Sequence, residues 1–89
     1  MARVSFTANL KRHVPCPPAV VAGATVRAAL EEVFADNPRL KSYLLDDQGR
    51  LRRHVNVFVN GAAVADRDGL GDPVAGSDEV YVFQALSGG

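Results

Sequence analysis

The chain has 89 residues, and 47% of them are hydrophobic, which is enough for one small domain with a single core and argues against intrinsic disorder. Ten basic and ten acidic residues give a formal net charge of zero, so the electrostatic footprint of a nucleic-acid-binding protein is missing. No stretch approaches the ~18 apolar residues of a membrane span, no signal peptide opens the chain, and the single cysteine, Cys16, has no partner for an internal disulfide. We therefore expect a cytoplasmic protein that binds neither membranes nor nucleic acid.

The first part of the chain predicts a β-hairpin. In "RVSFTANL", apolar side chains at Val4, Phe6, Ala8 and Leu10 alternate with polar ones, which is the pattern of a half-buried strand. The prolines of "KRHVPCPP" then exclude a helix, and "AVVAG" is short and partly β-branched. We expect it to form the second strand of the hairpin.

The next segment, "TVRAALEEVFADNP", predicts an amphipathic helix. Thr25 is a suitable N-cap, and Asn37-Pro38 marks the end, since the residue before a proline is pushed out of the helical region. The apolar face consists of Val26, Ala29, Leu30, Val33 and Phe34.

Two further strands and a hairpin turn are predicted after a short helical turn at Arg39 to Leu44 and a turn at Asp47-Gln48-Gly49. "HVNVFVNG" alternates, with Val55, Val57 and Val59 on one face and Phe58 between two asparagines on the other. Asn60-Gly61 is typical of a type I′ hairpin turn, which leads to a brief strand around Ala63 to Ala65.

The last third predicts a surface connection and a final strand. "DRDGLGDPVAGSDE" is rich in turn-forming residues, with Leu70 and Val74 as anchors in the core. "EVYVFQAL" alternates again, with Val80 and Val82 opposite Tyr81 and Phe83. The sequence therefore predicts a two-layer α+β domain, in which a mixed sheet of about five strands packs on one main helix.

This element order, the "VNVFVNG" strand and turn, the Thr-capped helix and the Gly88-Gly89 end behind "DEVYVFQALS" resemble the ubiquitin-like β-grasp sulfur carriers of the ThiS, MoaD and CysO type. The resemblance covers the whole chain. The segment "GRLRRHVNVFVNG" and the length are most similar to CysO-like carriers. It implies a β-grasp domain over residues 1–86 and a flexible Ser-Gly-Gly tail over residues 87–89.

The resemblance also implies a function in which the chain is a protein co-substrate and not an enzyme. An E1-like adenylyltransferase/sulfurtransferase would transfer AMP from ATP onto the carboxylate of Gly89, and a sulfur nucleophile would displace it to leave a thiocarboxylate. Since the chain has no phosphate-binding G-x-x-x-x-G-K-[ST] motif, ATP would be bound by the partner, and we expect no cofactor on this chain. In CysO-like systems the other partners are a cysteine synthase that receives the tail and a metalloprotease that frees the product.

Three aromatic side chains are predicted on the sheet face that points away from the helix, and an exposed apolar surface of this kind usually marks a binding site. We interpret it as the partner-docking face, to which Leu86 and Ser87 of the tail would contribute beside Gly88. Arg52 and Arg53, in the basic run "RLRR", are candidates for contacts at its rim. The three aromatic residues are Phe58, Tyr81 and Phe83.

Other residue types with possible chemistry lack a supporting pattern. Cys16 has no CxxC partner, and His13 and His54 lack metal-ligand spacing, so we interpret all three as loop, surface or packing residues. The aspartate pairs Asp46-Asp47 and Asp66/Asp68 lie in turn contexts, where aspartate forms local hydrogen bonds.

Two other classes of function stay open. The first is a ubiquitin-like modifier that is conjugated to lysines of target proteins, and the second is an interaction domain whose tail is incidental. Within the carrier class, molybdopterin, thiazole, modified tRNA and thio-containing secondary metabolites are alternatives to cysteine as the destination of the sulfur.

Overall fold

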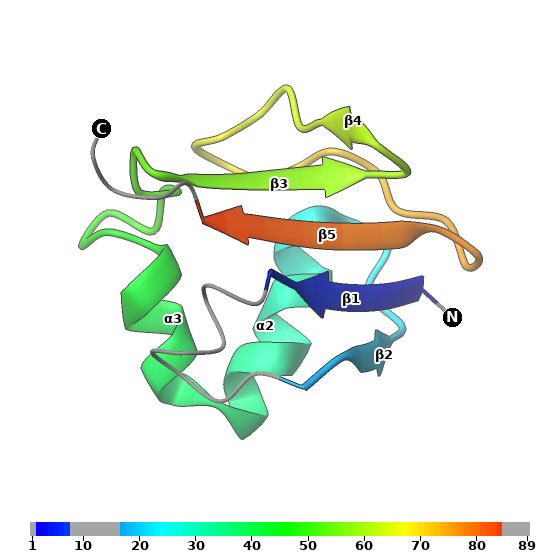
Figure 1. Ribbon diagram of the computed structural model, residues 1–89, viewed down its shortest axis with the longest axis horizontal. Coiled ribbons are helices and arrows are strands. Elements are labelled where there is room, and N and C mark those ends of the chain that lie inside the picture. Colours follow the sequence, from blue (N-terminus) through cyan, green and yellow to red (C-terminus); the bar gives the residue numbers. More distant parts are fainter. Residues whose placement is uncertain (1, 8–16, 85–89) are drawn as a thin grey trace.

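A mixed five-stranded sheet with two helices on one of its faces makes up the fold, as the ribbon diagram of this computed structural model shows (Figure 1). The structure describes residues 2–7 and 17–84. The strands lie side by side in the order β2-β1-β5-β3-β4. In chain order the elements are β1 (Ala2–Phe6), β2 (Ala19–Val21), α2 (Val26–Asp36), α3 (Pro38–Leu44), β3 (Val55–Val59), β4 (Ala62–Ala63) and β5 (Glu79–Gln84).

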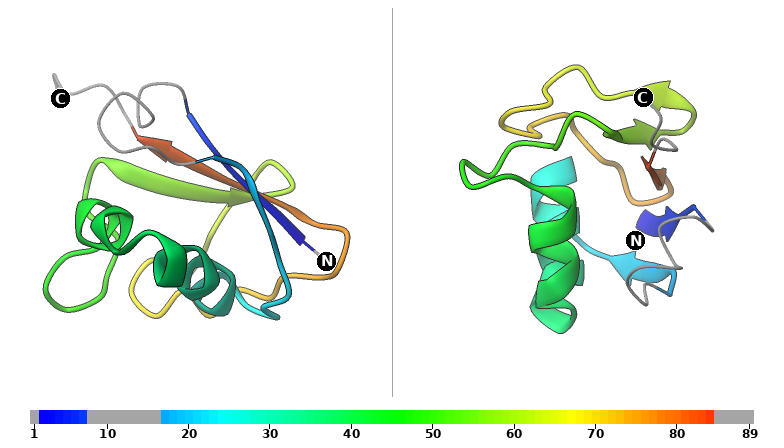
Figure 2. Two further views of the ribbon diagram at one scale, coloured as in Figure 1. Left: turned by 90° about the horizontal axis from the view of Figure 1, so that it is seen from below. Right: turned by 60° about the vertical axis from the view of Figure 1, so that its left-hand side comes forward.

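The centre of the sheet is the parallel pair β1 and β5, and every other strand pair is antiparallel. A parallel pair needs a crossover connection, and α2 supplies part of it by packing across the sheet (Figure 2). This arrangement confirms the predicted β-grasp fold, including the hairpin of the first two strands.

The core lies between the sheet and the helices. Alternate residues of the two strands β3 and β5 point into it, and the predicted apolar face of α2 closes it from the other side. None of the four inward valines of these strands exposes more than 1% of its surface. These four are Val55, Val57, Val80 and Val82.

Helix α2 begins and ends as predicted. The hydroxyl of Thr25 accepts a hydrogen bond from the N–H of Ala28 at 3.1 Å, and the helix ends at Asp36, two residues before Pro38. The short helical turn predicted at Arg39 to Leu44 is a second helix, α3, which begins one residue earlier. Pro38 occupies its first turn, where a missing N–H costs nothing. Leu40 and Leu44, on the inner face of α3, are completely buried.

The Asn60-Gly61 turn has positive φ at both residues, 52° and 86°, as the predicted type I′ turn requires. The strand that follows is shorter than predicted and lies at Ala62–Ala63. Past the strand, the N–H of Val64 still donates to the carbonyl of Val57 at 3.0 Å, but the carboxylate of Asp72 accepts the following two backbone donors, the N–H groups of Ala65 and Asp66, both at 2.9 Å. These two donors are thereby drawn away from the sheet.

The connection between β4 and β5 is anchored in the core by Leu70 and Val74, as predicted. Leu70 has a positive φ of 56°, which is uncommon for a leucine, and its side chain is fully buried. The Asp66 carboxylate holds this conformation by accepting the N–H groups on either side, from Gly69 at 2.8 Å and Gly71 at 3.1 Å. These hydrogen bonds lower the pKa of Asp66 below its ordinary value of 3.8.

The lowered pKa predicts an acid-dependent loss of stability. A carboxyl group with a depressed pKa in the folded state stabilises the fold fully above its unfolded pKa of 3.8, and this contribution is lost as the pH falls through the lower folded value. Asp66→Asn should therefore lower the Tm at pH 7, and the difference from the parent protein should shrink as the pH falls below 3.8. Thermal unfolding between pH 7 and pH 2 measures this; Asp68→Asn, at an exposed position of the same loop, serves as the control and should leave the Tm unchanged.

Candidate functional site

The end of β5 is held in place from both sides of the sheet. Val82 of β5 pairs with Phe6 of β1, while Gln84 at the end of β5 pairs with Val55 at the start of β3. Two ladders of backbone hydrogen bonds therefore hold β5 as far as Val82, and the ladder with β3 continues to Gln84, directly before the last five residues. The predicted tail residues Leu86, Ser87, Gly88 and Gly89 lie outside the described residues, and so does the predicted boundary between the domain and the tail.

Three aromatic side chains, Phe58, Tyr81 and Phe83, lie on the sheet face that points away from the helices, as the alternation predicted; we call this surface the aromatic face. Tyr81 is 42% exposed and Phe83 39%, while Phe58 is half-buried. Phe58 pairs directly with Tyr81 across the strands, a geometry in which two aromatic side chains contact one another.

Small residues on the neighbouring strands keep the aromatic face open. Ser5 of β1 pairs with Tyr81 on one side, and Ala63 of β4 pairs with Phe58 on the other. At the far edge of the sheet, Val20 is 64% exposed. Exposed apolar side chains that share one face in this way are the usual mark of a surface that binds another protein.

In the basic run before β3, two arginines have partners within the described part of the chain. The Arg50 side chain forms an ion pair with Asp46 (Nε to Oδ2, 3.3 Å), and the guanidinium of Arg52 donates to the carbonyl of Ser42 at 3.0 and 3.2 Å. Arg52 is thus bound to α3, and its predicted role at the rim of the docking face stays a prediction. Arg53 and His54 are exposed.

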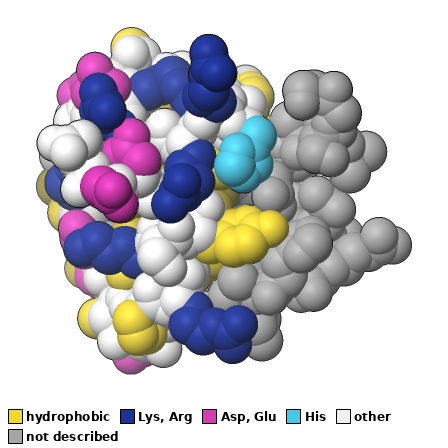
Figure 3. Space-filling view, turned by 90° about the vertical axis from the view of Figure 1, so that its left-hand side faces the viewer, with side chains coloured by type: hydrophobic (Ala, Val, Ile, Leu, Met, Phe, Trp, Pro, Cys, Tyr) yellow, Lys and Arg dark blue, Asp and Glu magenta, His cyan; other side chains and the backbone are white. Residues whose placement is uncertain are grey.

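Positive side chains gather on the side of the molecule where β3 begins and β5 ends. In the space-filling view of this side, several Lys and Arg side chains surround a small hydrophobic area and one His (Figure 3). One contributor is Arg67, whose guanidinium donates to the Asn56 side chain at 2.8 Å and to the carbonyl of Arg52 at 2.9 Å. No pattern in the sequence predicts this contact, because Arg67 reaches β3 from the long connection after β4.

The aspartates in turns have the structural role that the sequence predicted. The Asp46 carboxylate accepts the N–H groups of Arg50 and Gln48 at 3.0 and 2.9 Å, and these bonds, with the Arg50 charge, lower the pKa of Asp46. Within residues 2–7 and 17–84, no three His, Cys, Asp or Glu side chains are placed to hold a metal ion, and no helix is long and apolar enough to cross a membrane. Cys16 and His13 lie outside these residues.

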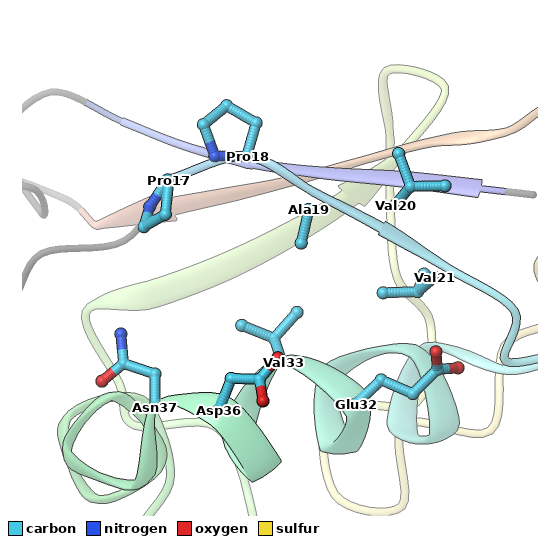
Figure 4. Close-up of a pocket in the computed structure, with 9 residues that line it drawn as sticks. All are labelled: Pro17, Pro18, Ala19, Val20, Val21, Glu32, Val33, Asp36 and Asn37. Atoms are coloured by element: carbon cyan, nitrogen blue, oxygen red, sulfur yellow. The ribbon is translucent and has the colours of Figure 1, made fainter.

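A groove of about 370 Å³ lies between β2 and the second half of α2 (Figure 4). The sequence did not predict it, because its width depends on how far the helix packs from the edge strand. Beside the groove, the Glu32 carboxylate of α2 accepts the N–H of Ala22 at 3.0 Å and so covers part of the sheet edge. None of the aromatic-face residues lines the groove, and we do not assign the candidate site to it.

The family is shown by comparison with known proteins. The model of the ThiS family matches residues 17–89, which is most of the chain. The chain belongs to the ThiS family. The match confirms the resemblance predicted from the sequence, and it includes the segment that continues from β5 to Gly89.

Members of the ThiS family that resemble this chain include both carriers and modifiers. The sulfur carrier protein CysO of Mycobacterium tuberculosis is 32% identical over 89 residues, covering 97% of this chain and 96% of the relative. Small archaeal modifier protein 1 of Haloferax volcanii is 41% identical over 66 residues, covering 74% of this chain and 71% of the relative. Among solved structures, the Amycolatopsis orientalis BexX/CysO complex contains a chain that superposes with a TM-score of 0.83, at 28% identity and full coverage of both chains.

The alternation of β5 predicts opposite energetic roles for adjacent residues. Val82→Ala removes two buried methyl groups and should lower the free energy of unfolding by about 2 kcal/mol. Tyr81→Thr, on the aromatic face, should lower it by less than about 1 kcal/mol, because the ring is partly exposed and contacts few core atoms. Urea unfolding of both variants checks this; equal losses would show that the aromatic face is part of the core and not a free surface.

Proposed function

We propose that this chain is a sulfur carrier whose C-terminal glycine is activated by an E1-like enzyme and converted to a thiocarboxylate. The observation that carries the proposal is that a ThiS-family domain holds its last strand rigidly between two others and continues from it into Leu-Ser-Gly-Gly. The body of the fold would dock on the partner, and the tail would enter the active site.

The chemistry of the carboxylate explains why a partner is needed. A terminal carboxyl group has a pKa of about 3.5, so near neutral pH it is an anion and a poor electrophile. Transfer of AMP from ATP, with release of pyrophosphate, would convert it into an acyl-phosphate anhydride. A sulfur nucleophile can then attack the carbonyl carbon and expel AMP. The residues needed to bind ATP and magnesium would belong to the partner.

The composition of the tail suits a narrow channel. Four residues, Leu86 to Gly89, span at most about 14 Å when fully extended. Two glycines at the end let the partner close around the backbone and allow φ values that other residues avoid. The aromatic face would meanwhile supply the contact area outside the channel, since exposed Tyr and Phe are common at the energetic centre of protein interfaces.

Cysteine biosynthesis is the destination of the sulfur that we favour. The CysO relatives align with nearly the whole chain, and a chain of the BexX/CysO complex superposes on this fold. In that pathway the thiocarboxylate would be presented to a cysteine synthase, and a metalloprotease would release the cysteine formed on the carrier. Molybdopterin, thiazole or a thio-containing secondary metabolite would be reached by the same activated tail and a different acceptor enzyme.

The resemblance to small archaeal modifier protein 1 favours a second function, conjugation to lysines of target proteins. Activation would be identical, and only the last step would differ, because a lysine amine would attack in place of a sulfur nucleophile. Purification of the tagged chain from its own host under denaturing conditions separates the two functions. Covalent adducts joined through Gly89 to lysines would identify a modifier, and their absence together with a thiocarboxylate would identify a carrier.

Replacement of the last residue tests the role of the tail. Gly89→Ala should reduce ATP–pyrophosphate exchange by the E1-like partner at least about tenfold, because a methyl group is added where the partner closes around the backbone. The matched control is Gly76→Ala, at an exposed turn glycine whose φ is outside the left-handed region. It should leave the exchange rate and the Tm unchanged. Full activity of Gly89→Ala would contradict the proposed mechanism.

A further inference from the structure

Two exposed residues, Arg53 and His54, lie at the end of the sheet from which the chain leaves β5. They are the central residues of a tight turn, closed by a hydrogen bond from the N–H of Val55 to the carbonyl of Arg52 at 3.0 Å. Because Val55 at the start of β3 pairs with Gln84 at the end of β5, this turn and the end of β5 lie at the same end of the sheet. We call Arg53 and His54 the exit rim.

The cations around the exit rim are used within the fold. Arg50 pairs with Asp46, and Arg52 and Arg67 donate to backbone or side-chain oxygens. Lys41 pairs with Glu31 at 3.5 Å. Within the described ranges 2–7 and 17–84, the Arg53 side chain makes no hydrogen bond or ion pair. The fold thus leaves one guanidinium of this cluster available to another molecule.

Two of the carboxylates in the turns near this charge have partners of their own. Asp46 is engaged by Arg50 and by the backbone of its own turn, and Asp66 by the N–H groups around Leu70. Both basic and acidic side chains lie on this side of the molecule, and basic ones lie next to the His (Figure 3). An anionic group is therefore the ligand that this surface fits.

The anion would be a protein carboxylate and not the phosphate of the adenylate. Five residues separate Gln84 from the carboxyl end of Gly89, a span of up to about 17 Å when the tail is extended. A fully inserted tail would carry the phosphate well away from Arg53, and the exit rim would face the mouth of the channel. A guanidinium presents paired donors that match a carboxylate in a bidentate geometry.

From this placement we infer that the exit rim docks on an acidic rim, formed by Asp or Glu side chains, around the channel of the activating enzyme. The inference rests on the proposed function and deepens it by naming the chemistry of the partner surface. Its role is to orient the carrier so that the tail enters, and Arg53 is a positioning residue and not a catalytic one. Charges at an interface rim act mainly on the association rate and are screened by salt.

Charge reversal at Arg53 tests the inference with the E1-like adenylating enzyme of the organism that encodes this chain. In ATP–pyrophosphate exchange, Arg53→Glu should lower kcat/KM about tenfold at 50 mM salt, through KM, and the loss should shrink to about twofold at 500 mM salt. Arg53→Lys should recover much of the loss. The matched control is Arg39→Glu, the same charge change at an exposed position in the first turn of α3, and it should stay within about twofold of the parent protein.

The outcomes separate the two proposals. Suppose that the parent chain supports ATP–pyrophosphate exchange. If the kcat/KM of Arg53→Glu then equals that of Arg39→Glu, or if its loss of kcat/KM does not depend on salt, the proposed contact of the exit rim is wrong and the carrier function stands. If the parent chain with intact Gly89 supports no exchange, the proposed function fails, and the acidic partner surface fails with it.

Discussion

The pairing of β5 with β1 on one side and β3 on the other is the constraint on which the rest of the structure depends. It places the last strand of the domain in the middle of the sheet, although this strand comes at the end of the described chain. A strand at the edge would have one free side and would fray more easily. Here β5 has a partner on each side as far as Val82, and β3 continues to pair with it up to Gln84.

Adjacent residues of β5 serve two different purposes because side chains alternate across a strand. Val80 and Val82 fill the space beneath α2, whereas Tyr81 and Phe83 form part of the aromatic face. The same strand therefore stabilises the fold, exposes two aromatic side chains and leads toward the last five residues of the chain. The turn at Arg53 and His54 lies beside its end and adds charge to this arrangement.

Much of this organisation could be predicted from the sequence, because it follows from short-range patterns. The alternation in "EVYVFQ", the Thr25 cap and the Asn60-Gly61 turn each determine local geometry, and all three are present in the structure. The features that were missed depend on contacts between distant segments. Arg52 could not be assigned to the carbonyl of Ser42 without knowing how α3 packs. The pairing after β4 stops at Val64, because Asp72 accepts the N–H groups of Ala65 and Asp66 that follow.

In the proposed function the reactive group is the backbone carboxyl of Gly89, which the folded body would present to other enzymes. The most direct test is the mass of the C-terminal peptide of the protein isolated from its own host, with trapping of thioacids by an alkylating reagent. We predict a peptide that ends at Gly89, a fraction of which carries one sulfur in place of one oxygen and reacts with the reagent. A mature chain that continues beyond Gly89, or a carboxyl group that never carries sulfur or an adduct, would contradict the account.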